Sequence, residues 1–185
     1  MKKLLVLVTL FICVTSYSQY DVNLEITDWK EGTEKVLYGN SIKRLEGYND
    51  RYHITNLGYQ SLPQLIDKIN KKAEAEMWNE EKKSSTINSY QSQVKGGILH
   101  LYIARITLAT ANTNMYTVII KDKNEVELSR EELKSKVPEV PRDNKLWTNY
   151  KVISIPTEIK EKFYVYLIDA AGMDGRIKYK FEINP

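Results

Sequence analysis

Apolar and polar residues alternate along several short stretches of the chain, which is typical of β-strands that bury one face. In residues 176–183 the alternation is complete, because apolar side chains take every second position and charged ones the positions between. Residues 20–27 show the same pattern. Further strands are predicted at 98–109, 115–121, 125–128, 146–155 and 163–169. The chain is therefore predicted to be mainly β.

The order and spacing of these stretches indicate how they pair. Residues 98–109 are apolar at odd and even positions, which predicts a central strand covered on both faces. Asp174–Gly175, just before the last strand, is a favoured hairpin turn, and the glycine-containing region 31–60 predicts short strands and turns. Such spacing favours an antiparallel β-sandwich. An immunoglobulin-like architecture is an analogy that carries no function.

One long helical pattern interrupts the strands, at residues 61–83. Ser61 is a suitable N-cap, and Pro63 lies in the first turn, where a missing amide hydrogen costs nothing. Apolar residues follow the three-and-four spacing of a single amphipathic face. The members of this face are Leu62, Leu65, Ile66, Ile69, Ala73 and Met77. The serine-rich residues 84–93 are predicted as a loop, and a capping box predicts one helical turn at 129–132.

The N-terminus has the three parts of a secretory signal peptide. Two lysines come first, residues 4–14 are almost entirely apolar, and Ser16 and Ser18 provide the small side chains that signal peptidase accepts before its cut. The apolar run is shorter than the roughly 20 residues needed to cross a bilayer. We therefore expect residues 1–18 to be removed, the protein to be periplasmic, secreted or cell-surface associated, and no stable membrane insertion afterwards.

Cys13 is the only cysteine of the chain. A lipid anchor on this residue would need a small side chain immediately before it, and Ile12 does not fit that requirement. When Cys13 leaves with the signal, the mature chain has no thiol. Disulfides, cysteine metal sites and thiol nucleophiles are then excluded.

Residues 19–185 suit a single domain, which at this length can bury a core without disulfides. The helix falls in an N-terminal region, 19–95, and a β core is expected at 96–185. Without the two lysines of the signal, 25 basic residues face 24 acidic ones, and both signs are mixed along the chain. Nucleic-acid binders concentrate a basic excess on one surface, so we expect no nucleic-acid partner.

No motif in the sequence predicts a catalytic residue, a metal ligand or a cofactor. His53 and His100 lie in unrelated contexts, and two histidines without cysteine make a zinc site improbable. His100 is predicted to be a hydrogen-bonded structural histidine on a strand. Ser92 and Lys95 match the S-x-x-K spacing of penicillin-recognising enzymes, but the companion motifs are absent and the match is interpreted as chance.

The acidic residues of the sequence do not form a recognisable calcium site or a locatable carboxylate pair for glycoside hydrolysis. Asp122–Asn124 lacks the glycine and the next ligand of a calcium loop. A hairpin turn accounts for Asp169 and Asp174 better than a shared ion does. The glutamates of the predicted helix are interpreted as a solvated face.

The three tryptophans all fall outside the apolar pattern of their own elements. Trp29 and Trp147 share their alternation with polar neighbours, and Trp78 lies about 180° around the helix from Ile69. Exposed rings can anchor a protein partner or stack on sugars. Trp29, Trp78 and Trp147 are therefore candidate ligand-binding residues. The alternative is burial beneath a second layer, which is the usual fate of large aromatic side chains.

Three functions remain open from the sequence. The first is an exported, non-catalytic β domain that binds a protein, a glycan or an envelope component. The second is an exported hydrolase whose carboxylates meet only in the folded protein. The third is a structural or assembly subunit that uses exposed sheet edges.

The export signal gives the first testable prediction. Mass spectrometry of the protein recovered after export should find an N-terminus at Gln19, because Ser16 and Ser18 are the small residues that cleavage requires. An intact Met1 or a lipid on Cys13 would contradict it.

Overall fold

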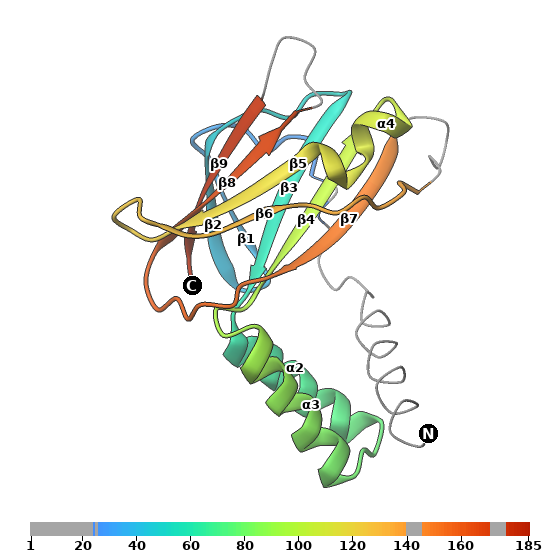
Figure 1. The fold of residues 1–185 in the computed structure, drawn as a ribbon, viewed down its shortest axis with the longest axis vertical. Coiled ribbons are helices and arrows are strands. Elements are labelled where there is room, and N and C mark those ends of the chain that lie inside the picture. The colour runs from blue at the N-terminus through green and yellow to red at the C-terminus, as the bar shows by residue number, and fades with distance from the viewer. Residues whose placement is uncertain (1–23, 25, 140–145, 171–176) are drawn as a thin grey trace.

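The structure, a computed structural model, describes residue 24 and residues 26–139, 146–170 and 177–185. Two antiparallel sheets form a mainly β body, and a pair of helices projects from one end of it (Figure 1). The predicted β class and antiparallel pairing are confirmed. The predicted signal peptide, most of the predicted strand at 20–27 and the turn at Asp174–Gly175 lie outside the described residues.

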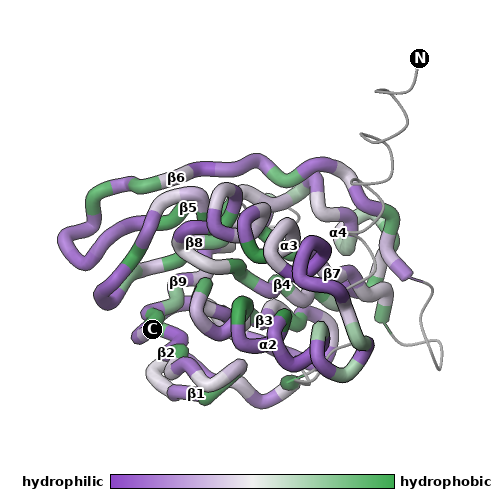
Figure 2. The backbone as a smooth tube through the Cα atoms, turned by 90° about the horizontal axis from the view of Figure 1, so that it is seen from below, coloured by the Kyte–Doolittle hydropathy of each residue, from purple (hydrophilic) through white to green (hydrophobic). Residues whose placement is uncertain are grey.

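The larger sheet has six strands in the order β1-β2-β9-β8-β5-β6, and the smaller has three in the order β3-β4-β7. The strands are β1 Glu34–Leu37, β2 Asn40–Glu46, β3 His53–Gln60, β4 Ile98–Arg105, β5 Tyr116–Lys121, β6 Glu127–Glu132, β7 Trp147–Ser154, β8 Phe163–Asp169 and β9 Ile177–Asn184. Seen from below, the six strands follow one another along one side, while β3, β4 and β7 line the other (Figure 2). Each sheet therefore combines strands from the N-terminal and the C-terminal half of the chain.

The core lies between the two sheets. Its largest contributors alternate along the strands, as the sequence pattern requires: Leu99 and Leu101 come from β4, Val165 and Leu167 from β8, and Phe181 from β9. Each of these side chains is 1% exposed or less. Seven of the eight residues of β4 are buried, which confirms the prediction of a central strand covered on both faces.

Two local predictions are wrong. The strand predicted at 98–109 ends at Arg105, because the chain turns there into a short helix, α4 (Leu108–Ala111), whose N-cap Thr107 accepts a hydrogen bond from the Thr110 amide at 3.2 Å. A 3-10 turn, η1 (Thr113–Met115), follows it. The helical turn predicted at 129–132 is instead part of β6, since its backbone pairs with β5.

In the part of the chain that the structure describes, no helix is long and apolar enough to cross a membrane.

A buried arginine of β2 joins the two sheets. Arg44 is completely buried, and its guanidinium donates to the side-chain oxygens of Asn49 (3.0 Å) and Asn56 (3.1 Å) and to the carbonyl of Thr55. Thr55 and Asn56 belong to β3, the edge strand of the smaller sheet. The side chain therefore makes the connection that backbone pairing does not make between β2 and β3.

Aromatic rings surround the same guanidinium. Its central carbon lies 5.1 Å from the ring centroid of Trp29, 5.4 Å from Phe181 and 5.8 Å from Tyr179. Among the described residues no carboxylate pairs with Arg44. The charge is stabilised by carbonyl oxygens and ring faces instead. Burial lowers the pKa of Arg44 to about 10, so the side chain is still charged at neutral pH.

A second buried arginine connects the sheets between β4 of the smaller sheet and β8 of the larger one. Arg105 of β4 donates to Asp169 of β8 at 2.6 Å, to the Thr55 hydroxyl at 2.6 Å and to the Ile54 carbonyl at 2.6 Å. Arg105 and Asp169 are 0% and 1% exposed. The two arginines share Thr55, whose carbonyl binds Arg44 and whose hydroxyl binds Arg105. They form one polar layer across the core.

We predict that Arg44→Met lowers the free energy of unfolding by about 3 kcal/mol. The substitution removes the donor from three oxygens that are shielded from water, and such loss is costly in a buried network. Urea denaturation of the mature protein measures the change. Arg130→Met is the matched control, because this arginine is exposed and its ion pair with Glu127 lies at the surface, so the midpoint should be nearly unchanged. Equal midpoints for the two variants would contradict the prediction.

Candidate functional site

The helices that project from the sandwich form an antiparallel pair, which we call the arm. It consists of α2 (Leu62–Ala75) and α3 (Glu80–Gln93), and it leaves the body between β3 and β4 (Figures 1 and 2). Each helix has 14 residues. The arm places its far end well away from the sheets, and we call that end, residues 76–79, the arm tip.

The root of the arm is packed against the sandwich. Leu65 of α2, Val94 at the end of α3 and Ile98 at the start of β4 form a small buried cluster. Gln64 adds polar contacts: its side-chain oxygen accepts from the Ser61 amide at 2.8 Å, and its nitrogen donates to the Tyr38 carbonyl at 2.9 Å. The arm is therefore fixed in direction where it meets the body.

The helix predicted at 61–83 is broken in two. The backbone amide of Trp78 donates to the Ala73 carbonyl at 2.8 Å, and the backbone amide of Met77 donates to the Glu74 carbonyl at 3.2 Å. These two bonds form a Schellman motif, which ends α2. Asn79 then caps α3, because its side chain accepts from the Lys82 amide at 2.8 Å. The missed signal is Asn79 followed by two glutamates, a favourable helix start.

The loop predicted at 84–93 is also wrong, because these residues belong to α3. The serine-rich sequence predicts a loop because serine hydroxyls compete with the helical backbone. Here the hydroxyls of Ser84 and Thr86 donate back to carbonyls of the preceding turn, at 2.6 and 2.7 Å. No residue of α3 is buried. The helix packs beside α2.

Met77 at the arm tip combines exposure with an unfavourable backbone. Its side chain is 92% exposed, the highest value among the large apolar residues described. Its φ angle is +50°, in the left-handed region that glycine usually occupies after a helix. Such a conformation costs of order 1 kcal/mol in a residue other than glycine. The Schellman motif accounts for the left-handed angle. The side chain, in contrast, buries almost none of its surface in the fold, which marks the position as a functional candidate.

Trp78 lies next to Met77 and is held by charged neighbours. Its indole nitrogen donates to Glu76 at 2.8 Å. The ammonium groups of Lys82 and Lys72 lie 4.0 and 5.9 Å from its ring centroid. The ring is half-buried by these contacts. The arm tip thus presents an exposed thioether beside a positioned aromatic ring, two side-chain types enriched in protein interfaces.

The charges around the arm tip cancel. Residues 71–83 hold four lysines and four glutamates, and no histidine. A surface that binds phosphate polymers or anionic lipid carries a basic excess. The arm tip therefore has a mixed polar rim around an apolar centre, as protein interfaces do.

The other two candidate tryptophans lie far from the arm tip. Trp29 is 1% exposed and belongs to the core beside Arg44. Trp147 is half-buried at the start of β7, opposite Arg105 in the register and so at the other end of the sheet from the arm. The three rings do not form one surface. Of the sequence candidates, only Trp78 lies beside an exposed apolar side chain of the arm tip.

His100 is the centre of a hydrogen-bonded and stacked group on the outer face of the smaller sheet. Its Nε2 faces the side-chain oxygen of Gln60 at 3.0 Å, so this nitrogen donates, and Nδ1 accepts from the Tyr150 hydroxyl. The Tyr38 ring stacks on the imidazole with centroids 4.3 Å apart. Gly58 makes room for the Tyr38 ring, since a Cβ at this position would lie 2.7 Å from that ring.

These contacts confirm His100 as a buried, hydrogen-bonded histidine. Both ring nitrogens are occupied, and the side chain is 6% exposed. Burial lowers the pKa of His100 to about 4, and the ammonium of Lys68 on α2 acts in the same direction. The imidazole is neutral at physiological pH and has no position left for a metal.

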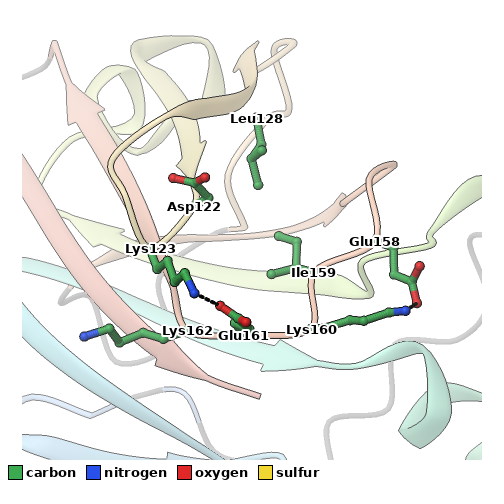
Figure 3. A pocket seen from close by; sticks show the side chains of 8 residues that line it. All are labelled: Asp122, Lys123, Leu128, Glu158, Ile159, Lys160, Glu161 and Lys162. Carbon is green, nitrogen blue, oxygen red and sulfur yellow. Dashed lines mark ion pairs between the residues drawn. The ribbon is translucent and has the colours of Figure 1, made fainter.

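A shallow hollow of about 330 Å³ lies between the β5–β6 turn and the segment before β8 (Figure 3). Its charges are already paired: Lys123 contacts Glu161 at 2.5 Å and Lys160 contacts Glu158 at 3.3 Å. The Asp122 carboxylate accepts from two amides of its own turn. No convergent set of groups is left to hold a ligand.

The structure does not bring together the residues of the other sites that the sequence suggested. Among the described residues, no group of three or more histidines, cysteines or acids is placed to hold a metal ion. Ser92 lies near the end of α3 and its hydroxyl donates to the Ser89 carbonyl at 2.8 Å. Asp169 is engaged by Arg105 inside the core. Comparison of the chain with family models, curated proteins and solved structures gives no match.

The buried imidazole predicts how stability depends on pH. The unfolded chain takes up a proton near pH 6.5, whereas folded His100 resists protonation down to about pH 4. Its contribution is complete above pH 6.5 and is lost as the pH falls toward 4, by up to about 3 kcal/mol. Urea unfolding of wild type and His100→Asn at a series of pH values should show a flatter slope for the variant over this window.

The second histidine of the chain serves as the control. His53→Asn should retain the wild-type slope between pH 6.5 and 4, because the dependence is assigned to His100. If His100→Asn and wild type lose stability in parallel, the assignment is wrong.

Proposed function

We propose that this protein is an exported, non-catalytic binding module that holds a protein partner through the arm tip. The β-sandwich serves as a rigid base, and the arm carries the contact away from it. Export rests on the signal-like residues 1–18, and the mature protein works outside the cytoplasm.

One observation carries the proposal, which is the state of Met77. A large apolar side chain is almost fully exposed, on a strained backbone, at the far end of a projecting pair of helices. Within the described chain almost none of the Met77 side chain is buried by packing. An interface that buries Met77 would recover of order 2 kcal/mol of hydrophobic free energy, and Trp78 beside it supplies the residue type most common at binding hot spots.

The surroundings of the arm tip favour a protein over other partners. A sugar ring would stack on an open indole face, but Lys82 already lies 4.0 Å from the centroid of Trp78. The balanced lysines and glutamates give no field for nucleic acid or an anionic bilayer. The partner therefore offers an apolar pocket for the thioether, bordered by polar groups of both signs.

We predict that Met77→Gly weakens partner binding at least tenfold while the free energy of unfolding stays within about 1 kcal/mol of wild type. Glycine accepts the left-handed conformation, so the substitution removes the contact side chain without disturbing the end of α2. The partner is first identified by photo-cross-linking from position 77 in envelope extract, and its Kd for each variant is then measured with purified components.

Two further variants make the experiment selective. Trp78→Ala should also weaken binding, whereas Val137→Ala, at a 72% exposed apolar position away from the arm, should not. Equal affinity of Met77→Gly and wild type would refute the arm tip as the contact. Cross-links obtained equally well from position 137 would point to non-specific capture and refute it too.

A further inference from the structure

Met77 also differs in its exposure to oxidants from Met115, the other methionine that the structure describes. The chain has four methionines, of which Met1 lies in the predicted signal peptide and Met173 lies outside the described residues. Met115 is partly buried and packs against the hydrophobic core. The thioether of Met77, on a side chain that is 92% exposed, is open to any oxidant in solution.

The composition removes the usual competitor. Thiols react with peroxides before thioethers do, but the only cysteine, Cys13, lies in the segment expected to be cleaved. In the mature chain a methionine sulfur is then the softest group that an oxidant meets. An exported protein also works in an oxidising environment.

We propose that Met77 is an oxidation site that switches the arm tip. Hydrogen peroxide transfers one oxygen atom to the thioether sulfur: a sulfur–oxygen bond forms, the peroxide oxygen–oxygen bond breaks, and water leaves. Sulfur loses two electrons and the peroxide gains them. The product is methionine sulfoxide, which reductases return to the thioether.

The consequence follows from where the side chain lies. Sulfoxide formation in a core disrupts packing, whereas at Met77 the added oxygen points into solvent and the fold does not change. What changes is the chemistry of the arm tip, because its apolar centre becomes polar. This inference rests on the proposed function: a pocket that accepts a thioether excludes its sulfoxide, and partner binding falls at least tenfold.

The first test needs only the mature protein. It is exposed to dilute hydrogen peroxide and quenched at intervals, and peptide mass spectrometry follows each methionine. Met77 should be oxidised at least tenfold faster than Met115, with no change in Tm when only Met77 has reacted. Equal rates, or a fall in Tm that tracks Met77 oxidation, would overturn the proposal.

The second test separates the switch from the binding function itself. Wild type and Met77→Leu are compared with the cross-linked partner before and after peroxide treatment of the module alone. Wild type should lose binding and recover it with methionine sulfoxide reductase, while Met77→Leu should bind throughout. Equal loss in both proteins overturns the switch but leaves the arm-tip contact in place. Absence of binding by untreated wild type overturns the proposed function.

Discussion

The attachment of β2 to β3 through Arg44 is the interaction on which the rest of the structure depends. The six-stranded and three-stranded sheets share no backbone hydrogen bonds at this edge, so the guanidinium supplies the connection. Its partners are two asparagine side chains and a carbonyl, and three aromatic rings enclose it. A charge placed this way is tolerated only when every neighbour is already in position. The sheets and this polar layer therefore specify each other.

Side chains of β2 also hold the strand from which the arm begins. β3 is held against β2 by Arg44 near its middle, and Asn40 reaches the Tyr59 carbonyl at 2.8 Å near its end. Asn40 also donates to Gln64, the residue that closes the first turn of α2. The direction of the arm is thus set by side chains of the larger sheet, although the arm is inserted between strands of the smaller one. Apolar packing at the root then stabilises that direction.

Much of the fold could be predicted from apolar patterning, because strand periodicity is a local property. The alternation predicts β8 at its observed bounds and β4 as a strand covered on both faces.

Arg44 could not be found this way, since a charged residue inside an alternating stretch is normally interpreted as solvent-facing. Trp29 was misleading for the same reason: its polar neighbours suggested a surface, whereas it packs on Arg44. The split of the arm had a local signal, the N-cap Asn79 followed by two glutamates, but the continuous apolar spacing of residues 62–77 favoured one longer helix. Only half of the candidate site can be predicted from the sequence. The pattern indicates Trp78 as a candidate, but it places Met77 on the buried face of a longer helix.

The length of the arm has a geometric consequence. Fourteen residues of α-helix extend about 21 Å, so a partner held at the tip would stand off from the sandwich by about two thirds of the diameter of a small domain. Two large bodies can then be joined without their surfaces meeting. In the proposed function the arm acts as a spacer, and the gap is fixed by the number of helical turns between Ser61 and the tip.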